Sequence, residues 1–175
     1  MASKVQGGAH RWRIIGWGTA AALILTPLVE MQFTREVDWR ASDFLFAMVL
    51  IGGVGAVYEV AVRRTRSPAY RAGVAFALAA AFLIAWANGA VGMIGPEDNW
   101  YNLFFYGVIL VALTGAVIAR FRPTGMARAM GAAAVAQAVV SGGGLYSDPR
   151  GGLLSLAFAG SWLVSAAFFV RAARS

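Results

Sequence analysis

Residues 83–102 read LIAWANGAVGMIGPEDNWYN, and this stretch decides how the chain is arranged. Its first half is apolar apart from a Trp and Asn88, and a second apolar run starts at Trp100. A Gly-Pro pair at 95–96 and two acidic residues lie between the halves. Gly and Pro interrupt helices, and charged side chains are costly in hydrocarbon. The stretch therefore predicts two membrane-spanning helices joined by a tight polar turn outside the bilayer.

The composition of the whole chain is that of a membrane protein. Of its 175 residues, 59% are hydrophobic and 13% are charged. Soluble domains have roughly 45–50% apolar and about 25% charged residues. The chain has no Cys, which excludes disulfides, a thiolate nucleophile and Cys-ligated metals. We therefore expect an all-α fold, a polytopic membrane helix bundle.

Six apolar segments, each close to the length of about 20 residues that a membrane-spanning helix needs, follow one another. The six transmembrane helices are predicted at 14–29, 44–62, 72–94, 100–119, 126–146 and 153–170. They form one domain over residues 14–170, between basic tails at 1–13 and 171–175. The first helix follows a basic start, as a secretory signal does, but no small-x-small cleavage site comes after it. We expect it to be retained, with Pro27 kinking or ending it.

The distribution of charge orients these six helices. The segments on the side of the N-terminus hold all but three of the 15 Lys and Arg residues. The same segments hold only one of the 8 Asp and Glu residues, Glu59. Because short cytoplasmic loops are enriched in Lys and Arg, both termini are predicted to be cytoplasmic. The net charge of +7 then reflects topology, so the expected partner is the lipid bilayer and not nucleic acid.

Two uncharged amides, Asn88 and Gln137, lie inside predicted spans. One interpretation is a polar pocket between the third and fifth helices. The other is that each amide hydrogen-bonds a neighbouring helix, which contributes about 0.6–2 kcal/mol in a bilayer. We favour the second, because such amides commonly hold helices together.

Glu59 is the third member of this candidate intramembrane polar site. A carboxylate within a membrane-spanning helix is a candidate proton site. However, Arg63 follows four residues later on the same helix face. Glu before Arg at that spacing forms a favourable ion pair, and we favour this structural role.

The remaining acidic residues of interest form an outer rim. They are Glu30, Glu36, Asp38, Asp43, Glu97 and Asp98. A hard cation needs several converging oxygens, and no loop has calcium-loop spacing. We therefore interpret the rim as solvated, and we expect no metal and no cofactor; the single His10 lies in the N-terminal tail.

Small residues predict a close helix contact within the opening stretch. Ala85, Gly89 and Gly92 follow one another at steps of four and three residues, which places them on one helix face. In membranes, such faces allow backbones to approach closely. We expect this face to pack against the fifth helix, with Asn88 bonded across the contact, or else against a partner protomer.

Residues 86–102 have the pattern W-x-N-x-A-V-G-x-x-G-x-E-D-N-x-x-N. With the downstream segment GVILVALTGAVIARFRPTGMARAM, this pattern resembles small polytopic bacterial inner-membrane proteins to which no activity is assigned. The resemblance runs from about Met31 to Gln137. It implies a location in the bacterial inner membrane and adds no mechanism.

The expected function is that of a non-enzymatic accessory or structural component of a membrane assembly. Its partners are then lipid and a membrane protein or a second copy of the chain. A small transporter or channel component is the alternative, with a polar path near Asn88, Gln137 and Glu59. We find no phosphate loop, no serine–histidine set and no metalloprotease motif in the sequence, so we do not expect an enzyme.

Overall fold

The computed structural model describes residues 2–35 and 38–175, with the backbone alone for residues 2–13. All regular elements in these ranges are helical, which confirms the all-α prediction. They are α1 (Ala2–Glu30), α2 (Ala41–Ala47), the π-helix η1 (Met48–Gly52), α3 (Gly53–Arg64), α4 (Pro68–Ala90), the 3₁₀ turn η2 (Trp100–Asn102), α5 (Leu103–Ile118), α6 (Pro123–Gly144) and α7 (Pro149–Arg174).

Four helical stretches of the described chain are long and apolar enough to cross a membrane. They are Ala41–Arg64, Pro68–Ala90, Trp100–Ile118 and Pro149–Arg174, and Ile14–Glu30 is a shorter apolar helix. The fifth expected span, α6, is not among the four; its sequence includes Arg128, Gln137 and several glycines, all of which lower its mean hydropathy. The membrane-like character of the chain is thus clear, whereas six crossings and their orientation stay predictions.

Proline marks the start of three helices. Pro68, Pro123 and Pro149 lie in the first turn of α4, α6 and α7. The missing N–H of proline has no partner at that position in any helix, and its fixed φ suits helical geometry. These helices therefore begin several residues before the predicted spans.

The N-terminal helix also differs from the prediction. The tail expected at 1–13 belongs to α1 over its described backbone, and Pro27 lies inside this helix. The helix continues to Glu30. Pro27 lacks an N–H group and so removes a single helical hydrogen bond. The carbonyls after it still find donors; for example, the Met31 N–H donates to the Pro27 carbonyl.

The chain divides into two compact units, Met1–Glu59 and Val60–Ser175. In the first unit, the Trp17 indole N–H donates a hydrogen bond of 2.8 Å to Glu59, and the same ring lies against Gly55. A single six-helix domain over residues 14–170 stays a prediction.

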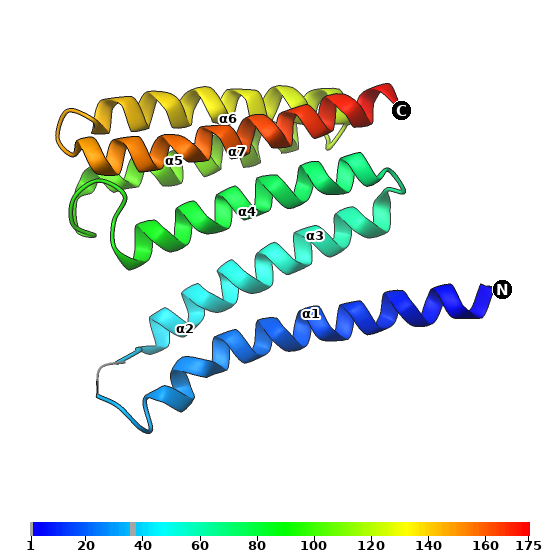
Figure 1. Cartoon of the computed structure of the whole chain (residues 1–175), viewed down its shortest axis with the longest axis horizontal. Helices are drawn as coiled ribbons and strands as arrows, with labels where there is room; N and C mark the ends of the chain where they lie inside the picture. Colours follow the sequence, from blue (N-terminus) through cyan, green and yellow to red (C-terminus); the bar gives the residue numbers. More distant parts are fainter. Residues whose placement is uncertain (1, 36–37) are drawn as a thin grey trace. The chain divides into compact units, whose positions relative to one another are not determined.

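The second unit is an antiparallel four-helix bundle of α4 to α7 (Figure 1). Helix α7 packs against both α4 and α6, and α5 packs mainly against α6. The core contains Trp162, Phe105 and Phe169 as its largest buried side chains. The polar side chains described below are therefore held between close-packed helices.

Small residues bring α5 and α6 into close contact near their connecting turn. A Cβ atom added at Gly115 would lie 2.7 Å from the Ala129 Cβ, and one added at Gly125 would lie 2.5 Å from the Ala119 Cβ. Both distances are too short for real side chains. This α5–α6 contact depends on backbone approach, as expected between helices that gain little from hydrophobicity in a bilayer.

Candidate functional site

The connection between α4 and α5 is organised by Asn102, whose side chain is buried. Its Oδ1 accepts hydrogen bonds from the N–H groups of Met93 and Ile94, at 3.1 and 2.9 Å. Its Nδ2 donates to the Pro96 carbonyl at 3.0 Å. One amide thus satisfies three backbone groups of a loop that has no secondary structure of its own. Unpaired, such groups would be costly to bury.

Two further amides complete this loop. The Asn88 Nδ2 donates to the Asn102 carbonyl at 2.6 Å, which joins the end of α4 to the start of α5. The Asn99 Nδ2 donates to the Ile94 carbonyl, while its Oδ1 accepts the N–H of Tyr101. The spaced asparagines of the opening stretch therefore replace the backbone hydrogen bonds that the turn lacks.

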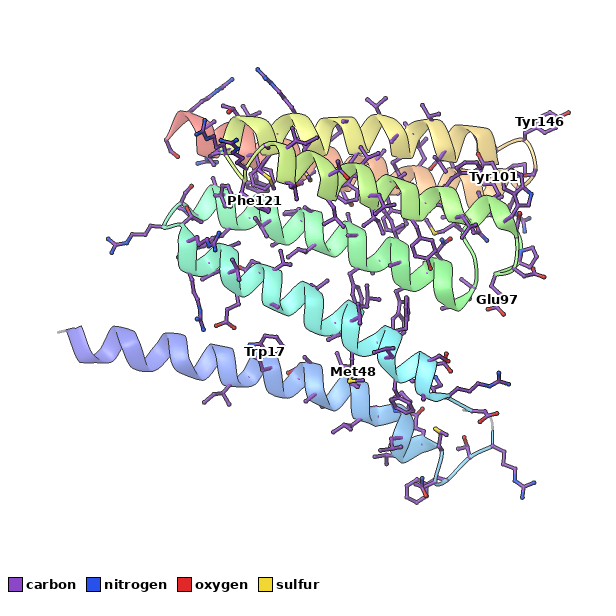
Figure 2. The ribbon with its side chains drawn as sticks, turned by 180° about the vertical axis from the view of Figure 1, so that it is seen from behind. Trp17, Met48, Glu97, Tyr101, Phe121 and Tyr146 are labelled. Carbon is purple, nitrogen blue, oxygen red and sulfur yellow. The ribbon has the colours of Figure 1, made fainter. Side chains whose placement is uncertain are left out.

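The loop and η2 are also bound to the C-terminal end of α6. The Tyr101 hydroxyl donates to the Val140 carbonyl at 2.8 Å, and a Cβ added at Gly143 or Gly144 would collide with Tyr101 or Ile94. Figure 2 places Tyr101 at the same end of the bundle as Glu97.

Asp148 contributes a second connection, between the α4–α5 loop and the α6–α7 turn. Its carboxylate accepts the Gly151 N–H at 2.9 Å, capping α7, and the Gly95 N–H at 3.0 Å. The hydrogen bond from Gly151, followed by that from Gly95, holds the pKa of this carboxyl below its usual range. Asp148 is thus both a helix cap and a loop anchor.

Gln137 belongs to a separate buried network between α6 and α7. Its Nε2 donates to the Ser141 Oγ at 3.2 Å and to the Ser155 carbonyl at 3.1 Å. The Ser155 Oγ lies 2.9 Å from the Ser141 Oγ and 2.9 Å from the Gly152 carbonyl. This network ties two helices together in the bundle interior.

Asn88 and Gln137 share no hydrogen-bond partner. Asn88 bonds to the start of α5, and Gln137 bonds to α7. Three buried atoms in the described side chains have no partner: Asn88 Oδ1, Gln137 Oε1 and Trp162 Nε1. An unpaired buried polar atom costs about 1–3 kcal/mol. A polar molecule bound beside one of these atoms would therefore supply the hydrogen bond that the atom lacks.

The predicted packing of the small-residue face within the chain is wrong, whereas its packing against a partner protomer stays a prediction. Ala85 is buried, but Gly89 is exposed, and Gly92 follows the end of α4 with φ +76°. A Cβ at Gly92 would meet Asn102, Gly95 and Pro96 atoms at 2.8 Å, so this glycine serves the loop. Helix α4 packs chiefly against α7 and not against α6, the fifth expected helix, and Asn88 bonds at the start of α5.

Most of the acidic residues assigned to the outer rim are exposed, and the rim itself stays a prediction. Glu30, Asp38, Glu97 and Asp98 are exposed, and Asp43 accepts the Arg40 N–H at the start of α2. Glu36 lies outside the described residues. Within the described ranges, no group of three or more potential metal ligands comes together. Glu59 and Arg63 lie four residues apart on α3, and their expected ion pair stays a prediction.

Several side chains of this site were not singled out from the sequence. Asn102, Asn99 and Asp148 make most of the contacts of the loop, and Ser155 completes the Gln137 network. The sequence does carry a signal for Asn99 and Asp148, because Asn or Asp directly before a helix start is typical of a cap. Asn102 makes no side-chain cap hydrogen bond, and its role follows from the folding of the loop around it. The pairing of Ser155 with Ser141 depends on how α6 and α7 pack, which spacing along the chain does not indicate.

The all-helical bundle and its apolar spans define the class of a helical membrane protein. No family model, no curated protein and no solved structure matches the chain.

Proposed function

We propose that this chain is a non-enzymatic accessory or structural protein of the bacterial inner membrane, with six crossings and both termini in the cytoplasm. The observation that carries the proposal is the use of its buried polar groups. Every buried polar side chain recorded in the core makes a hydrogen bond that ties helices or loops together; these are Asn88, Asn102, Gln137, Ser141, Ser155 and Ser165. A protein that acts through its shape and surface needs such an interior.

The bond from Ser165 illustrates this use. Its Oγ donates to the Gly73 carbonyl at 2.8 Å, and a Cβ at Gly73 would lie 3.1 Å from the Phe169 ring. Ser165 therefore joins α7 to α4 at a point of close packing. A solute path would instead leave polar side chains directed toward a water-filled space.

A small transporter or channel component is the second candidate, and one observation favours it. The buried Gln137 Oε1 and Trp162 Nε1 have no partner in the described chain. An acceptor and a donor of this kind are what a permeating polar molecule would contact.

Cysteine labelling separates the two candidates, and the chain suits it because it has no Cys. Ser141→Cys and Ser155→Cys replace buried hydroxyls, and Ser147→Cys serves as the exposed control. We expect a membrane-impermeant thiol reagent to label Ser147→Cys and to spare the other two. Rapid labelling of both buried positions in a folded protein would favour the transport candidate.

Reporter fusions test the membrane placement. Fusions after Arg66, Arg122 and Arg174 are expected to report the cytoplasm, and fusions near Asp98 and Asp148 the periplasm. A periplasmic signal after Arg122 would contradict the six-crossing topology.

The accessory role itself is tested by cross-linking in intact cells, followed by purification in mild detergent. We expect a membrane protein, or a second copy of the chain, to be recovered in fixed stoichiometry. Recovery of the uncross-linked monomer alone would count against an accessory role.

A further inference from the structure

The turn between α5 and α6 has an unusual backbone. Arg120 and Phe121 adopt φ values of +48° and +57°, in the left-handed region that residues other than glycine rarely occupy. Each such residue costs roughly 1–2 kcal/mol. Two in succession persist only where the surroundings hold them, and such strain is often found at functional positions.

The surroundings hold this turn from two sides. The Tyr70 hydroxyl of α4 donates a hydrogen bond of 2.8 Å to the Phe121 carbonyl, and the Phe121 N–H donates to the Ala116 carbonyl at 3.1 Å. Beside the turn, Gly125 of α6 lies directly against Ala119 of α5. The turn is therefore rigid, although its side chains point outward.

Those side chains combine charge with an aromatic ring. Arg120 and Arg122 are exposed, and Phe121 between them is 52% exposed. An exposed phenylalanine in the left-handed conformation adds little to the stability of the fold, since glycine would adopt the same φ without strain. Figure 2 shows Phe121 at the opposite end of the bundle from Glu97 and Tyr101.

The charges of the second unit are separated between its two ends. Its acidic residues, Glu97, Asp98 and Asp148, belong to the α4–α5 loop and the α6–α7 turn. Apart from Arg150, its arginines belong to the other end. Arg71 is committed to the Thr65 and Val62 carbonyls. The acidic side chains of this unit therefore lie at the end opposite to the arginines around Phe121.

We infer that the Arg120–Phe121–Arg122 turn is a binding site for the headgroups of anionic phospholipids. The ring enters the boundary between headgroups and acyl chains, where aromatic side chains are favoured. The two guanidinium groups bind phosphate oxygens, for which their fork of donors is suited. The inference rests on the proposed placement of this end at the cytoplasmic leaflet, whose anionic lipids attract basic segments.

The test is equilibrium binding of phosphatidylglycerol to the full-length protein in mild detergent, measured by native mass spectrometry. Phosphatidylcholine is the comparison lipid. We expect phosphatidylglycerol to bind more tightly, and the double variant R120Q/R122Q to lose about five-fold in affinity for each arginine removed. The double variant R64Q/R66Q removes the same charge from exposed positions at the same end, and we expect a smaller loss.

Phe121→Gly separates binding from folding. Because glycine relieves the left-handed strain, thermal stability is expected to be unchanged or higher, while lipid affinity falls. Equal losses in R120Q/R122Q and R64Q/R66Q, full affinity in Phe121→Gly, or no preference for phosphatidylglycerol would each overturn the inference. These results do not depend on topology, which the reporter fusion after Arg122 tests separately.

Discussion

The two ends of the four-helix bundle are closed by different means. At the acidic end, the long α4–α5 loop is held by side-chain amides, above all by Asn102. At the basic end, the short α5–α6 turn is held by close backbone contact between Gly125 and Ala119 and by the Tyr70 hydroxyl. The difference follows from the length of the connection. A long loop has many backbone groups that need hydrogen-bond partners, whereas a tight turn brings two helices so close that only small residues fit between them.

This difference predicts which kind of substitution destabilises each end. The acidic end should fail when a hydrogen-bonding group is removed, because buried N–H and C=O groups then lose their partners. The basic end should fail when bulk is added, because α5 and α6 have no space between them at Gly115 and Gly125. Two kinds of substitution therefore probe the two ends.

The largest effect is expected from Asn102→Ala. It removes the partners of Met93, Ile94 and Pro96 at a buried position. At about 1–3 kcal/mol for each orphaned group, partly relieved by water, the free energy of unfolding should fall by about 3–5 kcal/mol. Thermal or denaturant unfolding in detergent measures this.

Glu97→Ala is the matched control for that variant, since Glu97 is exposed in the same loop. It should change the unfolding free energy by less than about 0.5 kcal/mol. Similar losses in both variants would mean that the loop is not organised by the Asn102 amide.

Gly125→Leu is expected to have the next largest effect. The new side chain would collide with Ala119 at the α5–α6 contact, and overpacking of this kind costs about 1–3 kcal/mol. Gly89→Leu is the control, because Gly89 is an exposed residue near the end of α4. Its stability should be unchanged or slightly higher, since leucine has the better helix propensity. A larger loss of stability in Gly89→Leu than in Gly125→Leu would show that the essential small-residue contact lies on α4.

The helical class and the succession of apolar segments could be predicted from composition and hydrophobicity alone. The turn at Gly95-Pro96 was also predictable, because Gly and Pro interrupt helices. The predicted spans start three or four residues after α4, α6 and α7 begin, because an apolar run does not include the first helical turn, where Pro68, Pro123 and Pro149 lie. Span counting depends on hydropathy, which Arg128, Gln137 and the glycines of α6 lower.

The packing of the candidate site was less predictable. Steps of three and four residues show that Ala85 and Gly89 are close on a helix surface, but they do not show which face is buried. The buried stripe of α4 includes Ile84, Ala85 and Asn88, and Gly89 lies just outside it. Likewise, the sequence indicates that Gln137 needs a partner, but the choice of Ser155 follows from the register of α6 against α7. Tertiary packing, and not local pattern, determines both.

Asp148 provides the smallest expected effect and the most specific test of the acidic end. Hydrogen bonds from Gly151 and Gly95 lower the pKa of its carboxyl in the folded protein. A lowered folded pKa means that the carboxylate contributes stability above its unfolded pKa of about 3.9, and that this stability is lost as the pH falls through the folded pKa.

Asp148→Asn should therefore flatten the acid-side decline of the melting temperature, whereas Glu97→Gln should leave it in place. Asparagine keeps an oxygen that can accept one of the two N–H groups, so the loss at neutral pH should be modest and should shrink with added salt. An unchanged acid profile in Asp148→Asn would show that the hydrogen bonds to the Asp148 carboxylate do not contribute measurably to stability, and that contacts such as the Tyr101–Val140 hydrogen bond hold the loop instead.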